Sequence, residues 1–382
     1  MATGSNSVAY MSCGSLLSTE QVTKIDINFD KSVQPRSPKQ ILLRGQNQAV
    51  IKNYEDSIVP NSKGMQPHVR RQCFGTCYLY ASKVILENQL KQQGSLPLES
   101  FVLSGPFIGA ISDLRIPSYT TVISPRELLH GGDSEALHTL NDKPLYYLSP
   151  ESINAIGSTH NALKLEEDFL KVFVEQQTFR YLGKTFTDHL YDPDSRIEST
   201  MVKAFQKYIQ VVGKEDVSIE SLTVKSIDYT RALIPWGDAE SYVTGYISTA
   251  FESTQKDVNR EIIRALKEQS PLPDSAFKKI NGAFADFAIP LIVSSLQKGR
   301  FVKISLNAKL FGETHSVTLT NLVVDKRTKK LIGFKYLNSH GDGFGVKGYG
   351  FLHAIEVAKY IFAIDIIRSV NIKKKPLRLS SF

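Results

Sequence analysis

The pattern of apolar residues changes near residue 298, and this change limits the possible folds more than any other feature of the sequence. Before it, apolar residues recur at helical spacing, as in the stretch 163–176. After it, residues 301–306 alternate between apolar and polar, and 315–324 and 331–337 are rich in strand-forming residues. Helices followed by consecutive strands in one chain predict an α+β fold.

The composition is that of an ordinary globular protein. The 382 residues are 42% hydrophobic and 22% charged, enough for one large or two modest domains. The formal charge of +8 is spread along the chain, and its densest run, Lys373–Lys375, has no aromatic partners, so we expect no nucleic acid. The stretch 284–296 contains Asp286 and Pro290, which predicts a buried helix and no transmembrane segment.

The three cysteines, Cys13, Cys73 and Cys77, exclude a disulfide framework and a four-thiolate zinc site. No pair of histidines with ligand spacing follows them, so we predict no metal and no cofactor. Residues 1–18 lack the basic and apolar segments of a secretory signal. Cys13, in the run Tyr-Met-Ser-Cys-Gly, weakly resembles a lipid-attachment site.

Cys77 stands at the expected start of a helix. Gly75 and Thr76 supply a turn and an N-cap hydroxyl, and apolar residues recur at helical spacing after them. Unpaired N–H groups in a first helical turn stabilise a thiolate, which is the nucleophilic form of cysteine. A cysteine in this place is either a small buried residue or a reactive one.

The run 72–78, Gln-Cys-Phe-Gly-Thr-Cys-Tyr, resembles the active-site signature of the papain family of cysteine peptidases. This resemblance implies that Cys77 is the nucleophile. It also implies that the Gln72 side chain and the Cys77 backbone N–H stabilise the oxyanion. Gln72 stands five positions before Cys77, where the family glutamine usually stands six before.

Two later motifs complete the resemblance. His315 begins an apolar run within Gly312–Leu319, similar to the family's motif for the catalytic base. The block 335–351 resembles the family's Asn-Ser-Trp-Gly region, which implies that Asn338 orients the histidine. His340 and Phe344 occupy the places where that region has tryptophans.

A fourth stretch, 123–129 followed by Gly131 and Gly132, resembles the family's helix and Gly-Gly strip. In the family this strip pairs with the substrate backbone, so Gly131 and Gly132 are expected to line the cleft. The cysteine that usually precedes the strip is absent here, and with it the usual disulfide.

The resemblance covers roughly residues 60–148 and 290–370, and implies a papain-like, two-lobed α+β fold. We therefore expect an N-terminal extension at 1–45, a helical lobe with the nucleophile at 46–149, a helical insertion at 150–290 and a β-rich lobe at 291–382. The insertion could gate substrates, bind an inhibitor or partner, or occupy the site before activation.

The expected activity is hydrolysis of a peptide or protein substrate by a Cys-His-Asn triad through a thioester acyl-enzyme. Other papain-like folds are amidases, transglutaminases or peptidoglycan peptide hydrolases, and some could bind partners without catalysis, so these alternatives stay open. The family favours a secreted or periplasmic location, whereas a cytoplasmic one also fits the chain.

Overall fold

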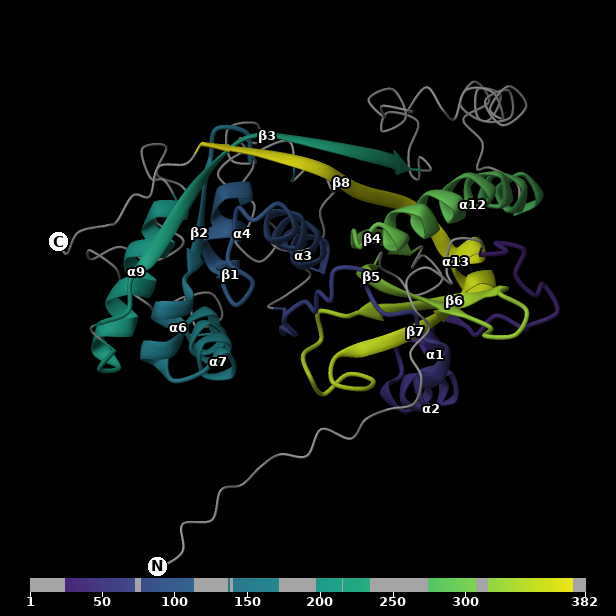
Figure 1. Cartoon of the computed structure of the whole chain (residues 1–382), viewed down its shortest axis with the longest axis horizontal. Helices are drawn as coiled ribbons and strands as arrows, with labels where there is room; N and C mark the ends of the chain where they lie inside the picture. Colours follow the sequence, from purple (N-terminus) through teal and green to yellow (C-terminus); the bar gives the residue numbers. More distant parts are fainter. Residues whose placement is uncertain are drawn as a thin grey trace, which may run out of the picture.

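The computed structural model describes residues 25–72, 77–112, 137, 140–171, 197–214, 216–233, 274–306 and 315–373. In these ranges the chain has an α+β fold built on one antiparallel sheet (Figure 1). The described part of the sheet has eight strands, in the order β1-β2-β3-β8-β4-β5-β6-β7. Their bounds are β1 (Phe101–Val102), β2 (Pro144–Leu148), β3 (Ile219–Leu233), β4 (Val302–Leu306), β5 (His315–Val324), β6 (Leu331–Leu337), β7 (Tyr349–His353) and β8 (Ile361–Lys373).

Helices pack on both halves of this sheet (Figure 1). The described α-helices are α1 (Pro38–Leu42), α2 (Arg44–Tyr54), α3 (Cys77–Gln92), α4 (Ser104–Ser112), α6 (Pro150–Ile156), α7 (Thr159–Leu170), α9 (Ile197–Val211), α12 (Asp274–Gln297) and α13 (Ala354–Tyr360). A 3-10 turn, η2 (Glu55–Ser57), follows α2. None of the helices in these described ranges combines the length and apolar character needed to cross a membrane.

Two hydrophobic cores divide the molecule into two lobes. One core lies among α3, α4, α6, α7, α9 and β1–β3, and the other among α12, α13 and β4–β7. The strand β8 belongs to both, because Ile361 and Ile364 pack in the second core whereas Ile367 and Val370 pack in the first. The long strands β3 and β8 therefore span the two lobes, as Figure 1 shows.

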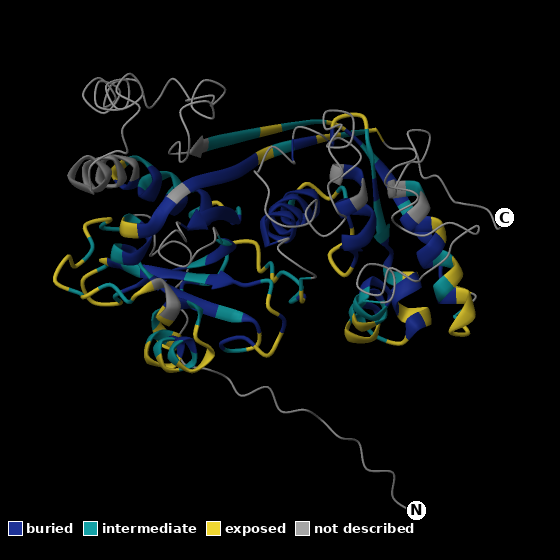
Figure 2. Cartoon of the chain, turned by 180° about the vertical axis from the view of Figure 1, so that it is seen from behind, coloured by how far each residue is buried: buried dark blue, intermediate teal, exposed yellow. Residues whose placement is uncertain are grey.

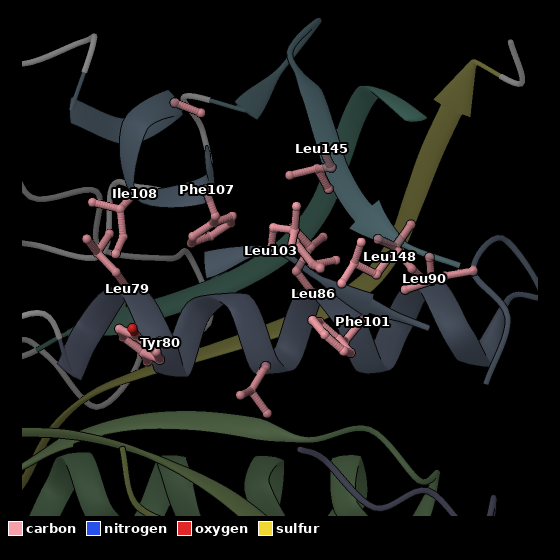
Figure 3. Packing of buried hydrophobic residues seen from close by; sticks show 14 of the residues in the cluster. Leu79, Tyr80, Leu86, Leu90, Phe101, Leu103, Phe107, Ile108, Leu145 and Leu148 are labelled. Carbon is pink, nitrogen blue, oxygen red and sulfur yellow. The ribbon is translucent and has the colours of Figure 1, made fainter. Parts of the chain in front are cut away.

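The helix α3 lies between the lobes. It begins at Cys77, where the sequence predicts a helix start, and nearly all of it is buried (Figure 2). Figure 3 shows Leu79 of this helix beside Ile108, and Leu86 beside Phe101 and Leu103, in the first core. On the β5 side, Thr318 donates a hydrogen bond to the Ala81 carbonyl at 3.5 Å. Contacts on both sides fix the position of the helix start.

The range 150–290, expected as a helical insertion, contains α6, α7, α9 and the start of α12, and it also contains the strand β3. This strand pairs with β2 and with β8, from Thr223↔Lys373 to Leu233↔Ala363. Register shifts between Val224 and Ser226, and between Asp228 and Tyr229, break its alternation of faces. These irregularities removed the period-two pattern by which a strand is predicted.

The described residues of the expected N-terminal extension pack on the second lobe. Arg36 binds Glu356 of α13 through Nε at 2.7 Å, and its Nη2 donates to the Phe351 carbonyl at 2.6 Å. Asn47, at the start of the next expected segment, is fully buried and accepts a hydrogen bond from the Phe351 N–H at 3.2 Å. This segment therefore supports the strand β7.

Candidate active site

Cys77 is the first residue of α3, and its thiol faces the start of β5. Its side chain is buried, with 7% of the residue exposed. The backbone N–H of Ser316 donates a hydrogen bond to Cys77 Sγ at 3.5 Å. Because Ser316 directly follows His315, this contact brings the predicted nucleophile against the strand end that carries the predicted base.

His315 and Asn338 are joined by a hydrogen bond of 2.9 Å between His315 Nε2 and Asn338 Oδ1. β5 and β6 are paired, with Thr318 opposite Leu337, so the start of β5 lies beside the end of β6. Asn338 is fully buried, and its backbone N–H donates a hydrogen bond to the Gly348 carbonyl at 3.1 Å. Since an amide oxygen accepts, Nε2 carries the proton in this pairing and Nδ1 is the basic nitrogen.

His340, at a position where the region it resembles has a tryptophan, lies beside the ring of His315. Its ring centroid lies 5.2 Å from that of His315 and 5.8 Å from that of Phe344, which meets it edge-on. Loss of hydration around the ring, together with the charges of His315 and Arg71, lowers the pKa of His340 to about 4. His340 is therefore uncharged near neutral pH and presents an aromatic face beside the base.

Gln72 is held beside the residue that follows Asn338. The backbone N–H of Gln72 donates to the Ser339 carbonyl at 2.7 Å, and the Ser339 hydroxyl donates to Gln72 Oε1. This second bond directs the NH₂ end of the Gln72 amide away from Ser339. The sequence predicted no role for Ser339, although it matches the serine of the Asn-Ser-Trp-Gly region.

A buried ion pair ties the expected insertion to the site. Arg70 Nη1 contacts Glu166 of α7 and donates to Ser104 Oγ at 2.7 Å, while the Arg70 carbonyl accepts the Gly341 N–H at 3.0 Å. Sequence reasoning missed this pair because its members lie 96 residues apart and neither belongs to a motif.

Burial decides the protonation of the Cys77 thiol. It raises the pKa of Cys77, and the backbone N–H groups of Ser316 and Tyr78 offset part of that rise. A smaller lowering comes from the charge of Lys303, whose Nζ lies 3.0 Å from Asp365 Oδ2 in a buried pair. The thiol therefore needs a base to accept its proton, and His315 directly precedes Ser316, whose N–H binds the sulfur.

Other predicted positions lie outside the described residues: Gly131 and Gly132, Cys13 and Cys73. Within the described ranges, no three His, Cys, Asp or Glu side chains gather as metal ligands.

Two hollows adjoin the site. Cys77 and Asn338 line a small one of about 10 Å³. A larger one, of about 990 Å³, is lined by His340, Gly341 and the helix α7. The two share three lining residues: His68, Arg70 and Tyr80. The larger hollow therefore borders the thiol's own surroundings.

No protein-family model matches the chain, and no curated protein matches it either. Solved structures do match. Xylellain, a cysteine protease from Xylella fastidiosa, is 10% identical with a TM-score of 0.34, over 89% of this chain and 91% of that one. A structure concerning the mite allergens Blo t 1 and Der p 1 is 12% identical with a TM-score of 0.36, over 90% and 85%.

A third match is the proform of the Amb a 11 cysteine protease, a major ragweed pollen allergen. It is 11% identical with a TM-score of 0.34, over 80% of this chain and 62% of that one. Similarity at this level carries no functional inference by itself, so we infer function from the side chains described above.

Proposed function

We propose that this protein is a papain-like cysteine peptidase that hydrolyses peptide bonds, with Cys77 as nucleophile, His315 as base and Asn338 as the orienting residue. The observation that carries the proposal is the hydrogen bond between His315 Nε2 and Asn338 Oδ1, at a strand end whose next residue binds Cys77 Sγ. Fixing Nε2 in this way leaves Nδ1 to take the thiol proton.

In the proposed reaction, His315 Nδ1 removes the Cys77 proton and the sulfur attacks the peptide carbonyl carbon. The negative charge that develops on the carbonyl oxygen is stabilised by the Gln72 amide and the Cys77 backbone N–H. The imidazolium then protonates the leaving amine as the C–N bond breaks, which forms a thioester. Water, deprotonated by His315, attacks the thioester and releases the acid, and the proton returns to the sulfur.

Substitution of the nucleophile tests the proposal. Cys77→Ala should lower peptide hydrolysis by at least about a thousandfold, because no other group forms the thioester. Its circular dichroism and melting temperature should stay close to those of the wild type, since Ala fits a helix start in a small hollow. Cys13→Ala serves as a matched loss of one thiol and should keep full activity. Normal peptide turnover by Cys77→Ala would disprove the proposal.

The burial of the thiol favours a second candidate function, binding in the cleft without hydrolysis. Only 7% of Cys77 is exposed, and the hollow beside it holds about 10 Å³. Incubation with a peptide epoxide inhibitor, followed by mass spectrometry of the Cys77 peptide, separates the two. A covalent adduct at Cys77 supports the peptidase, whereas an unmodified Cys77 in folded protein supports the binding protein.

The type of amide also needs a test, because the triad alone does not select it. Digestion of casein and a peptide library should exceed hydrolysis of peptidoglycan fragments and transfer to amine acceptors. The opposite order would replace the peptidase by an amidase, a peptidoglycan peptide hydrolase or a transglutaminase with the same nucleophile.

A further inference from the structure

The hollow of about 990 Å³ beside the candidate triad lies between parts of both lobes. One side is formed by Arg71 and the turn His340–Gly343, and the other by the helix α7. In Figure 1, α7 lies in the lobe on the left and the turn between β6 and β7 in the lobe on the right. A volume of this size lies at the upper end of the range for ligand pockets, about 300–1,000 Å³.

The position of His340 indicates which part of a substrate this hollow would take. In the proposed reaction the leaving amine must lie at His315, which gives it a proton. The ring of His340 lies 5.2 Å from the ring of His315 and also lines the hollow. The chain that follows the leaving amine therefore has its nearest large space in this hollow.

The helix α7 is a fixed wall of the hollow. Glu166, only 3% exposed, contacts Arg70 and accepts hydrogen bonds from the backbone N–H groups at the start of α4. Arg70 in turn accepts the Gly341 N–H through its carbonyl. These bonds connect α7 directly to the turn on the opposite side, so both walls are held in one network.

The surface that α7 presents to the hollow is charged. Besides Thr159 and Glu166, the polar lining residues of α7 and its C-cap recur at three- and four-residue spacing: His160, Lys164, Glu167, Asp168 and the C-cap Lys171. Lys171 pairs with Glu167 at 3.1 Å. Lys164 is exposed and has no ion pair within the described part of the chain, so its charge is available to a ligand beside it. Asp168 on α7 and Asp342 on the opposite wall also line the hollow, so the effect of Lys164 is confined to the ligand position next to it.

We infer that this hollow binds the segment of a peptide substrate C-terminal to the scissile bond, and that Lys164 of α7 favours an acidic side chain at the substrate position next to it. The inference rests on the proposed function. It gives part of the range 150–290 a role in substrate selection, in which α7 contacts the leaving segment of the peptide.

The test uses fluorescence-quenched peptides with one common sequence before the scissile bond. Each carries Asp or Lys at the first, second or third position after that bond, and the measured quantity is the Asp:Lys ratio of kcat/KM. This ratio is internal to each variant and cancels differences in active concentration. In Lys164→Glu the ratio should fall by about fivefold or more at one of these positions, the size of an exposed charge contact.

Lys207→Glu on α9 is the matched control. Lys207 is also exposed and helical in the same lobe, the substitution changes the net charge equally, and Lys207 does not line the hollow. Its Asp:Lys ratio should stay within about twofold of the wild-type ratio, because distant surface charges are screened.

An Asp:Lys ratio in Lys164→Glu equal to that of the wild type at all three positions would overturn the inference and leave the proposed function standing. If the wild type cleaves none of the peptides, the proposed function fails instead. Binding of the same peptides to Cys77→Ala protein, followed by fluorescence anisotropy, then decides the inference. Absent binding, or an Asp:Lys ratio of Kd that Lys164→Glu leaves unchanged, overturns it.

Discussion

At the scale of single residues, Asn338 holds the imidazole of His315 in the candidate site. Asn338 has no exposed surface, and its side chain meets the site through one bond, from Oδ1 to His315 Nε2. Its Nδ2 has no hydrogen-bond partner among the described residues. A buried amide with an unsatisfied donor lowers stability, so the bond to His315 is made at a cost to the fold.

Asn338→Ala should lower kcat by about tenfold to a hundredfold and leave KM nearly unchanged, because the imidazole loses its orientation while substrate contacts remain. Steady-state kinetics on one quenched peptide measures this. Asn321→Ala is the matched control: Asn321, on β5, donates from Nδ2 to the Val59 carbonyl at 3.0 Å and lines neither hollow. The control should lose some thermal stability and keep its kcat. Equal loss of kcat in both variants would mean that Asn338 acts only structurally.

At the scale of elements, α7 depends on one buried carboxylate. Glu166 binds Arg70 and the first N–H groups of α4, so a single side chain joins α7, α4 and the segment before Gln72. Both members of the ion pair have less than a tenth of their side chains exposed, 7% for Arg70 and 4% for Glu166. Removal of one partner leaves a buried charge without compensation.

Glu166→Gln should therefore lower the free energy of unfolding by roughly 3–5 kcal/mol, measured by urea denaturation. The double variant Arg70→Met with Glu166→Leu should recover much of this loss, because it removes both charges. Glu167→Gln is the surface control. Its partner Lys171 is 42% exposed, so a much smaller loss than that of Glu166→Gln is expected. Equal losses for Glu166→Gln and Glu167→Gln would contradict a structural role for the buried pair.

At the scale of the whole molecule, buried titratable groups between the lobes link stability to pH. His68 lies beside α3, with Nε2 at 3.3 Å from Lys91 Nζ and 3.8 Å from Glu87 Oε1. Burial lowers the pKa of His68 from 6.5 to about 4, and Glu87 opposes that change. The folded protein thus disfavours the charged ring, whereas the unfolded chain accepts the proton below pH 6.5.

Stability contributed by the neutral His68 ring is present above pH 6.5 and is lost as the pH falls towards 4. His68 contributes at most about 1.4 kcal/mol per pH unit to the change of the unfolding free energy with pH. Urea unfolding between pH 7 and pH 4 should give a shallower acid decline for His68→Phe than for the wild type. His160→Phe, at an exposed histidine of α7, should keep the wild-type decline. Parallel curves for His68→Phe and the wild type would refute this linkage.

The sequence by itself determined the local structure around the candidate site. Helical periodicity after Gly75 placed the start of α3 at Cys77, and strand patterns placed His315 and Asn338 at strand ends, because such patterns depend on neighbouring residues alone. The tertiary structure decided what these ends meet. Cys77 and Ser316 lie 239 residues apart, and their contact follows from the packing of α3 against β5. The same holds for Arg70 with Glu166 and for the strand β3, since long-range contacts and register shifts leave no periodic signal in the chain.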